Sequence, residues 1–340
     1  MVTLKDIAGE AGVSAATVSN VVNGNISKVS KANIIRINKI IRDRQYIPNS
    51  SARTLAAKSS HIIAGILVGK SGRNMLKDPY NAEFFGEVVS AVQERGYYLM
   101  IRYVDSYEEV VHSLRSWNVD GAVFIGTTGT YIKKIREAVK IPLVFTDSYT
   151  GTENINNVGI DDFRGGVLAA EFFLRRGHRN LGFLGYVPLR REKNVVTERL
   201  DGFRSALLKQ GIVMEEKHIF WADSYSPDHL AKVAAVLASG KSGISGLFVS
   251  ADILAISLME VLSKQGVRFP DDISLIGFDD LPIAANIRVP LSTIRQDVAG
   301  KARIAVDLLF RQIEKKNIPP ENIMTELSLV ERESVKVKNL

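Results

Sequence analysis

Small polar side chains follow one another along residues 14–20 in an order that can contact nucleic acid. The segment supplies Ser14, Thr17 and Ser19 as hydroxyl groups, Asn20 as a carboxamide, and Ala15 and Ala16 as small apolar groups. Hydroxyls of this size reach phosphate oxygens, a carboxamide can pair with the edge of adenine, and an alanine methyl can contact the methyl group of thymine. A helix that presents these groups together suits the major groove, whereas a three-helix bundle for protein contacts is the alternative.

Positive charge is concentrated in the same part of the chain. Residues 1–60 contain nine Lys and Arg residues against three Asp and Glu residues, which is +6 of the net +7 of the whole 340-residue chain. Clustered cations neutralise phosphates, so a basic segment attached to a nearly neutral remainder is typical of nucleic-acid binding. A solvated basic surface is the alternative that charge alone leaves open.

Two short helices and a longer one are expected to position these groups. Thr3 and Asp6 resemble a capping box, and Ser14 and Ser30 can cap the next two helices. Gly12 ends the first helix and allows a tight turn before the second. Helix, turn and helix with a third helix packed across them is the helix-turn-helix plan, in which the second helix enters the major groove.

A third candidate for DNA contact lies at residues 49–56. This segment has an N-cap in Asn49 and good helix formers, but it is too short to be a stable helix alone in water. With DNA as its partner, a helix that carries Leu55 beside Arg53 can wedge open a base step from the minor groove. A plain linker is the alternative.

From residue 61 onward, apolar runs alternate with amphipathic stretches, which is the pattern of a doubly wound α/β fold. Strands are expected at 62–68, 99–104, 122–127, 143–147, 181–186, 246–250 and 273–279, and helices at 82–95, 164–176, 199–210, 228–239 and 254–265. A change near 154–159 separates two series of strands and helices. We therefore expect two lobes with a binding cleft at the C-terminal ends of their strands.

Composition and spacing exclude several kinds of reaction centre. The absence of cysteine removes disulfides, thiolate zinc sites and cysteine nucleophiles, and the five histidines do not form an H-E-x-x-H pattern. The order G-x-G-x-x-G, a P-loop and a G-x-S-x-G elbow are also absent from the sequence. We therefore expect no cofactor, no metal and no enzymatic activity. The sequence has neither an N-terminal apolar segment nor an apolar run of membrane-spanning length, so a cytoplasmic protein is expected.

Longer motifs resemble those of one family of bacterial regulators. Residues 3–8 and 11–23 closely resemble the DNA-binding signature of the lactose-repressor/galactose-repressor (LacI/GalR) family, and the likeness continues at 46–49, 52–55, 177–179, 199–203, 276–280 and 293–296. The resemblance implies a homodimeric transcriptional regulator, usually a repressor and here of carbohydrate-metabolism genes. Such a protein binds a pseudo-palindromic double-stranded DNA operator and takes a small sugar-like effector between the lobes of a periplasmic-binding-protein-like core. The chain ends soon after Arg332, so a dimer rather than a tetramer is expected.

The resemblance also implies individual site residues. Ala15, Ala16 and Asn20 match the family's base-reading positions, and Leu55 matches the hinge-helix leucine that intercalates at the operator centre. Further DNA contacts are expected at Thr3, Ser14, Thr17, Ser19, Asn23, Ser30, Tyr46, Asn49, Ala52 and Arg53. Effector contacts are expected at Arg199 and Asp279, and more weakly at Phe84, Asp147, Tyr225 and Gln296. A guanidinium and a carboxylate can bracket neighbouring sugar hydroxyls, although either group can instead belong to a structural ion pair.

The expected organisation is an N-terminal all-α helix-turn-helix domain followed by a two-lobed α/β core with doubly wound parallel sheets. The boundaries expected are 1–47 for the DNA-binding domain, 48–60 for the hinge helix or linker, and 61–340 for the core. Within the core, one lobe is expected at about 61–157 plus 293–321 and the other at about 158–292 plus 322–334. An effector that binds the DNA-competent and incompetent states unequally would change the angle between the lobes, and with it the spacing of the hinge helices.

Two departures from the family pattern concern the ligand. Ala251-Asp252 stands where the family commonly has Asn-Asp, which removes one amide contact. The loops at 70–80 and 188–194 are rich in Lys and Arg, and if they face the cleft they favour an anionic effector such as a sugar phosphate or a uronic acid. Solvated loop charge is the simpler explanation.

Two other functions remain open from the sequence. A sugar receptor without a regulatory role would use the core alone, but it leaves residues 1–60 unexplained. A sugar-modifying enzyme would need a positioned acid–base pair, for which Asp147, Asp252 and Asp279 are nominal candidates. The spacing of these three carboxylates does not favour catalysis over hydroxyl recognition.

Overall fold

The chain folds into two compact units, Met1–Ser60 and His61–Leu340. A computed structural model describes residues 2–46, 59–69, 75–127, 129–148, 154–187, 193–222, 227–315 and 318–338. None of the helices in these ranges is both long and apolar enough to cross a membrane.

The first unit contains the helices expected from its capping residues. They are α1 (Leu4–Ala11), α2 (Ala15–Val22) and α3 (Lys31–Asp43), with a short 3-10 turn, η1 (Ile26–Lys28), before α3. The Thr3 hydroxyl caps α1 in a capping box with Asp6, and the hydroxyls of Ser14 and Ser30 cap α2 and α3. Gly12 ends α1 with φ at 64°, in the left-handed region, where a residue with a side chain would be strained.

One apolar stripe from each of the three helices forms the core of this unit. Ile7 of α1, Val18 of α2 and Ile37 of α3 have no exposed surface and pack in a single cluster. An ion pair of 2.9 Å between Glu10 and Arg44 joins α1 to the residue that follows α3. The packing leaves the other face of α2 to solvent.

The second unit is built on two six-stranded sheets, each flanked by helices. The first sheet has the order β11-β5-β4-β3-β1-β2, with β1 (Ile62–Val68), β2 (Tyr98–Val104), β3 (Gly121–Ile125), β4 (Leu143–Thr146), β5 (Asn156–Ile160) and β11 (Asn322–Thr325). The second has the order β12-β10-β9-β8-β6-β7, with β6 (Leu181–Tyr186), β7 (Ile219–Ala222), β8 (Gly246–Val249), β9 (Ser274–Asp279), β10 (Ser292–Gln296) and β12 (Leu327–Val330). All pairings are parallel except that of β12 with β10. The expected α/β class with two parallel-sheet lobes is confirmed.

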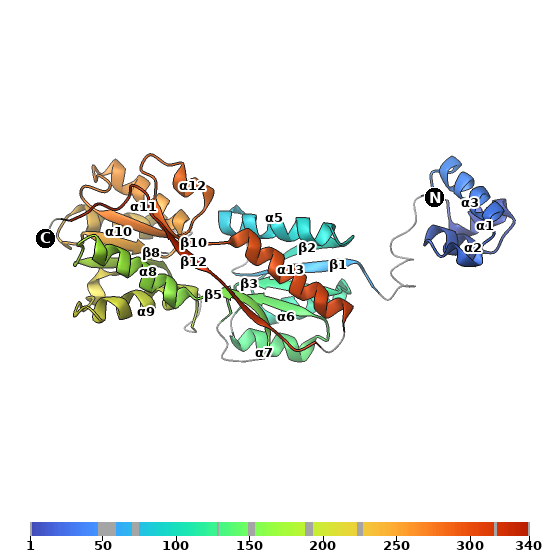
Figure 1. Cartoon of the computed structure of the whole chain (residues 1–340), viewed down its shortest axis with the longest axis horizontal. Coiled ribbons are helices and arrows are strands. Elements are labelled where there is room, and N and C mark those ends of the chain that lie inside the picture. The colour runs from blue at the N-terminus through green and yellow to red at the C-terminus, as the bar shows by residue number, and fades with distance from the viewer. Residues whose placement is uncertain are drawn as a thin grey trace. The chain divides into compact units, whose positions relative to one another are not determined.

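The first lobe buries both faces of its sheet (Figure 1). Its helices are η2 (Met75–Lys77), α5 (Pro79–Gln93), α6 (Tyr107–Ser116), α7 (Gly129–Ala138) and α13 (Val298–Glu314). Val123 and Val144 pack with α5 and α13, whereas their neighbours Phe124 and Phe145 pack with α6 and α7 on the other face. This alternation is the period-two pattern of a strand, and it explains why these strands read as continuous apolar runs.

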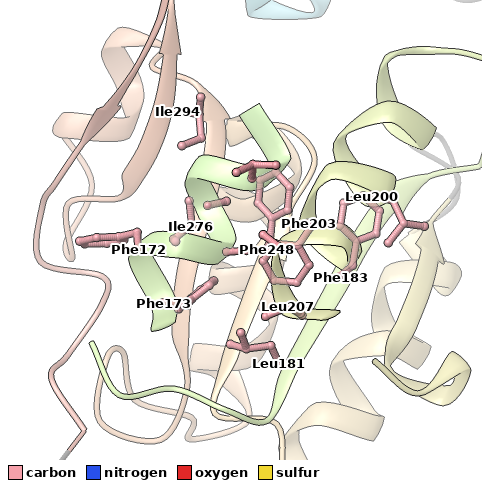
Figure 2. Close-up of a cluster of buried hydrophobic side chains, with 14 of the residues drawn as sticks. Phe172, Phe173, Leu181, Phe183, Leu200, Phe203, Leu207, Phe248, Ile276 and Ile294 are labelled. Atoms are coloured by element: carbon pink, nitrogen blue, oxygen red, sulfur yellow. The ribbon is translucent and has the colours of Figure 1, made fainter. Parts of the chain in front are cut away.

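The second lobe repeats the arrangement with its own helices. They are α8 (Asp162–Arg175), α9 (Val195–Leu208), η3 (Glu216–His218), α10 (Pro227–Ala238), α11 (Asp252–Lys264) and α12 (Pro282–Ala285). Figure 2 shows the cluster between the sheet and α8 and α9, where the rings of Phe183, Phe203 and Phe248 lie together. The ring centroid of Phe248 is 5.5 Å from that of Phe183 and 5.2 Å from that of Phe203.

The chain crosses between the lobes at positions that differ slightly from those expected. Strand β5 continues to Ile160 in the first sheet, and β11 (Asn322–Thr325) also belongs to that sheet. Strand β10, which begins at Ser292, belongs to the second sheet. The first lobe therefore extends beyond 157 and 321, and it resumes after β10 rather than at 293. These differences of a few residues arise because the short strands β5, β10 and β11 give a weak apolar signal in the sequence.

Candidate functional site

A partly open cavity of about 290 Å³ lies where strands of both sheets end, a size at the lower end for small-molecule sites. The first lobe contributes Asp78, Tyr80, Asn81, Ile125, Gly126, Thr127, Thr146 and Asp147. The second contributes Tyr186, Lys193, Asn194, Val195, Val196, Arg199, Ser250, Ala251, Ile253, Asp279 and Gln296. This position at the carboxyl ends of parallel strands is the usual ligand site of open α/β folds. We call it the lobe pocket.

Four of the six expected effector contacts meet in the lobe pocket: Arg199, Asp279, Asp147 and Gln296. Phe84 does not, because it has no exposed surface and packs between α5 and the first sheet. Tyr80, one turn earlier in α5, lines the pocket instead. The expected contact at Phe84 thus lies one helical turn after the residue of α5 that lines the pocket. Tyr225 lies outside the described residues.

Arg199 is held by the second lobe while it lines the pocket. Its Nε donates to Oδ1 of Asp162 at 2.6 Å, and its Nη1 donates to the carbonyl oxygen of Ser250. The guanidinium carbon lies 3.5 Å from the centroid of the Phe278 ring. Planar stacking and fixed donors of this kind suit an arginine and not a lysine.

Two glycines allow α8 and α9 to approach closely enough for this arrangement. A Cβ atom on Gly202 would lie 1.9 Å from the carbonyl oxygen of Phe163, and one on Gly166 would lie 2.0 Å from that of Arg199. Neither distance is possible between real atoms. Backbone contact between the two helices is therefore required to bring Arg199 against Asp162.

Two of the pocket carboxylates, Asp147 and Asp279, lie at the ends of their strands in unusual backbone conformations. Asp147, directly after β4, has φ 50°, and Asp279, the last residue of β9, has φ 115°. Residues other than glycine adopt such values at a cost, and they are concentrated at functional sites. Burial raises the pKa of Asp279 to about 7, although Arg199, Gln296 and Lys301 act in the opposite direction.

A buried lysine supports the pocket wall from behind. Nζ of Lys301, in the first turn of α13, lies 2.8 and 2.9 Å from the carboxylate oxygens of Asp147 and 2.6 Å from Oε1 of Gln296. Nε2 of Gln296 donates to Oδ1 of Asp279 at 2.6 Å. The hydroxyl of Tyr80 donates to Oδ2 of Asp147 at 3.1 Å, and burial together with the charge of Asp147 raises the pKa of Tyr80.

Two buried hydroxyl groups among the lining residues have no hydrogen-bond partner within the described part of the chain. They belong to Thr127, beyond β3 in the first lobe, and to Ser250, beyond β8 in the second. Their residues are 5% and 0% exposed. Because buried polar groups are almost always satisfied, such hydroxyls mark positions where a ligand can form hydrogen bonds. Sequence reasoning missed both, since a lone serine or threonine after a strand gives no distinct signal.

Asp252 has a structural position and does not line the lobe pocket. Its Oδ2 accepts from the backbone N–H of Leu281 at 2.9 Å, and its Oδ1 accepts from the Thr293 hydroxyl at 2.6 Å. Burial and the neighbouring charge of Asp279 raise its pKa. The trio of carboxylates considered for catalysis therefore does not converge on one pocket.

The described lining is not dominated by positive charge. The lining contains three acidic residues, Asp78, Asp147 and Asp279, and two basic residues, Lys193 and Arg199. Lys193 forms an ion pair of 2.8 Å with Glu198. Most cations of the two loops, including Arg190 and Arg191, lie outside the described residues. In the part of the chain that the structure describes, no group of three His, Asp or Glu side chains is arranged to hold a metal ion.

The candidate DNA interface is the solvent-facing side of α2. Ala16 is exposed, and Ala15, Thr17, Ser19 and Asn20 are half-buried at the same end of the unit as the N-cap Ser14. Of the remaining expected contacts, Thr3, Asn23 and Ser30 are exposed and Tyr46 is half-buried, whereas Asn49, Ala52, Arg53 and Leu55 lie outside the described residues. Several of these hydroxyls already form hydrogen bonds within the unit. The hydroxyl oxygens of Ser14 and Thr17 are 2.9 Å apart, and the Ser19 hydroxyl accepts from the Asn23 side-chain amide at 3.2 Å.

A helix-turn-helix unit joined to a two-lobed core with a pocket for a small molecule defines a class: DNA-binding regulators that respond to ligands. Residues 3–49 match the description "Bacterial regulatory proteins, lacI family", and residues 170–335 match "Periplasmic binding protein-like domain". The chain therefore carries a lacI-family DNA-binding domain together with a periplasmic-binding-protein-like domain, and it is a DNA-binding transcriptional regulator.

Relatives match along nearly the whole chain. The ribose operon repressor of Haemophilus influenzae is 28% identical over 98% of this chain and 99% of its own length. The regulator CelR of Thermobifida fusca is 26% identical over 98% of each chain. Among solved structures, a lac repressor dimer bound to operator and the anti-inducer ONPF is 25% identical, covers 98% of this chain and 99% of its own, and superposes with a TM-score of 0.85. A CelR–cellobiose complex, also 25% identical, covers 98% of this chain and 100% of its own with a TM-score of 0.72.

Proposed function

We propose that this regulator is a cytoplasmic, homodimeric repressor of carbohydrate-metabolism genes whose operator affinity is set by a small, neutral sugar-like effector in the lobe pocket. The ribose operon repressor, the CelR–cellobiose complex and the lac repressor dimer bound to operator support this proposal. The observation that carries it is the pair of hydroxyls of Thr127 and Ser250, which have no partner among the described residues and which the two lobes bring to one pocket.

The site residues proposed for the effector are Tyr80, Thr127, Asp147, Arg199, Ser250, Asp279 and Gln296. Carboxylates, hydroxyls and a guanidinium are the groups that pair with the adjacent hydroxyls of a sugar. Because Ser250 precedes Ala251, its hydroxyl can supply a contact near the position where the family commonly has an amide. On the DNA side, α2 is proposed to read bases through Ala15, Ala16 and Asn20.

A hydroxyl without a partner gives the proposal a sharp test. Removing it with Thr127→Val or Ser250→Ala takes away no hydrogen bond of the free protein, so the melting temperature without ligand should stay the same or rise. The affinity for a sugar effector should instead fall about fivefold to tenfold, the value of one net hydrogen bond.

The measurement is a thermal-shift panel followed by titration calorimetry, with D-ribose, D-glucose, maltose and cellobiose as probes. The proposal is supported if at least one of these sugars stabilises the wild-type protein and both variants bind that sugar more weakly. Thr130→Val, which also replaces a hydroxyl by a methyl group but lies on α7 outside the pocket lining, is the control for ligand affinity. If a variant binds the ligand as tightly as wild type does, the hydroxyl that it lacks does not contact the ligand.

A further inference from the structure

Lys301 is the starting point, because it is a fully buried cation that does not itself line the lobe pocket. It lies on the apolar face of α13, where Val298, Ala302 and Ala305 are buried beside the first sheet. A lysine in such a position loses its hydration, and an apolar side chain of similar size is often as stable or more stable there. Stability alone therefore does not account for this residue.

The surroundings of Lys301 impose a direction on the hydrogen bonds that reach the pocket. An ammonium group has donors and no acceptor, so each neighbour must turn an oxygen toward it. Asp147 does so with both carboxylate oxygens, and Gln296 does so with Oε1 at 2.6 Å. The hydroxyl of Tyr80, 3.2 Å from Nζ, is thereby left to donate to Asp147.

The direction is passed on through Gln296. With its oxygen toward Lys301, its amide nitrogen must donate, and it does so to Oδ1 of Asp279 at 2.6 Å. The reversed amide would place N–H groups against the ammonium and an oxygen against the carboxylate. Lys301 in the first lobe and Asp279 in the second sheet thus hold the Gln296 amide in one orientation from its two ends.

We propose that Lys301 is a positioning residue that sets the hydrogen-bonding direction of the lobe pocket, so that Asp147 and Asp279 act as acceptors toward the ligand. The pocket consequently selects ligands that donate hydrogen bonds to these two residues, namely hydroxyls of a neutral sugar or the ammonium of an amino sugar. A carboxylate or phosphate beside Asp147 is disfavoured, because it would face the oxygens of a carboxylate whose position Lys301 and Tyr80 fix. This inference rests on the proposed function, since it specifies the ligand class of the same pocket.

The first test needs no ligand, because the pKa of Asp279 depends on the charges and hydrogen bonds of its neighbours. The charged and titratable groups that act on Asp279 and on its neighbour Asp252 are Arg199 from α9, Lys301 from α13, Asp78 before α5, Asp280 beside it and Tyr80 of α5. Removal of the cation and release of the Gln296 amide should raise the pKa of Asp279. The pH dependence of unfolding is measured for wild type and for Lys301→Met, and each curve is referred to the same protein carrying Asp279→Asn. The difference isolates the titration of Asp279.

In Lys301→Met the midpoint of this difference curve should move upward by about one pH unit, the effect of losing one nearby opposite charge. A role in packing alone would lower stability at every pH without moving the midpoint, and that result overturns the proposal. Arg303→Met is the matched control, since Arg303 lies on the same helix but pairs with Glu87 and Glu94 at the surface. Its midpoint should equal that of wild type. Lys301→Arg, which keeps a group with donors only, should restore the midpoint toward the wild-type value.

The second test compares ring-matched probes in calorimetry: D-glucose with D-glucosamine and D-glucuronate, and D-ribose with D-ribose 5-phosphate. The wild type should bind only neutral or amino sugars among these, and Lys301→Met should bind them about tenfold more weakly while Arg303→Met is unchanged. Binding of an anionic probe in preference to its neutral counterpart overturns the proposal. If no probe binds, the choice of effector in the proposed function fails, and the pH measurement still decides the role of Lys301.

Discussion

Nε of Arg199 donates to Oδ1 of Asp162 at 2.6 Å, with side chains that are 7% and 0% exposed. Asp162 opens α8 and Arg199 lies in α9, so the pair joins the two helices at the edge of the lobe pocket. The two roles considered for Arg199, effector contact and structural ion pair, are therefore not exclusive. Its guanidinium is fixed by the fold and lines the pocket at the same time.

This relationship predicts an asymmetry between single and double variants. Arg199→Met removes the cation that pairs with the buried Asp162 and should lower the free energy of unfolding by about 3–5 kcal/mol. Arg199→Met/Asp162→Asn removes both charges and should recover most of that loss. Urea denaturation measures both. If Arg199→Met alone is as stable as wild type, the ion pair does not stabilise the second lobe.

The contact between α8 and α9 gives a second prediction. Gly202→Ala should destabilise the protein by more than about 2 kcal/mol, because its Cβ would lie 1.9 Å from the Phe163 carbonyl oxygen. The displaced α9 should also weaken ligand binding through Arg199. Gly86→Ala is the control, since Gly86 is exposed in α5 with nothing within 4 Å of the added methyl. It should stabilise the protein by up to about 1 kcal/mol in thermal unfolding, and a similar gain for Gly202→Ala would contradict the close packing.

The raised pKa of Asp279 predicts a definite dependence of stability on pH. With its pKa raised from 3.8 to about 7, the folded state keeps a proton that the unfolded state releases. Stability should therefore fall as pH rises between these values, by at most about 1.4 kcal/mol per pH unit from this group. Asp252, whose pKa burial also raises, contributes with the same sign. Denaturation from pH 4 to 8 should show a shallower fall for Asp279→Asn, and an equal slope would place the titration elsewhere.

The DNA interface predicts a loss of specificity without a loss of charge. Asn20→Ala should weaken binding to the preferred operator by about tenfold, as expected for one lost base contact. Its salt dependence should be unchanged, because no phosphate contact of a cation is removed. Asn38→Ala, the same change at an exposed position of α3, should bind like wild type. Fluorescence anisotropy at several salt concentrations measures both, and equal effects of the two variants would count against base reading by α2.

The helices of the first unit could be predicted because each begins directly after a residue whose side chain caps it, namely Thr3, Ser14 and Ser30. The family motifs likewise pointed to Arg199 and Asp279, which lie in one pocket. Strand β5 (Asn156–Ile160) was missed for a physical reason: its asparagines give no apolar run. Asn156 donates to the carbonyl of Leu143 and Asn157 donates to Asn322 across the sheet, so the strand is specified by contacts distant in sequence.

Lys301 was missed although a signal exists. It stands three residues after Val298 and four before Ala305, which is the register of the buried face of a helix. A lysine in that register requires a buried acceptor. Which acceptor it meets could not be predicted, because Asp147 and Gln296 reach it only through the folding of both lobes.

Affinity selection of fragmented genomic DNA tests the central claim most directly, which is that residues 1–60 read a specific site and that a ligand of the core controls them. Full-length protein and a 61–340 truncation are compared, each with and without the sugar that stabilises the wild type. We predict that only the full-length chain enriches one palindromic sequence and that the sugar changes its recovery. Enrichment of the same sequence by the truncation, or of none by the full-length chain under either condition, would contradict the account.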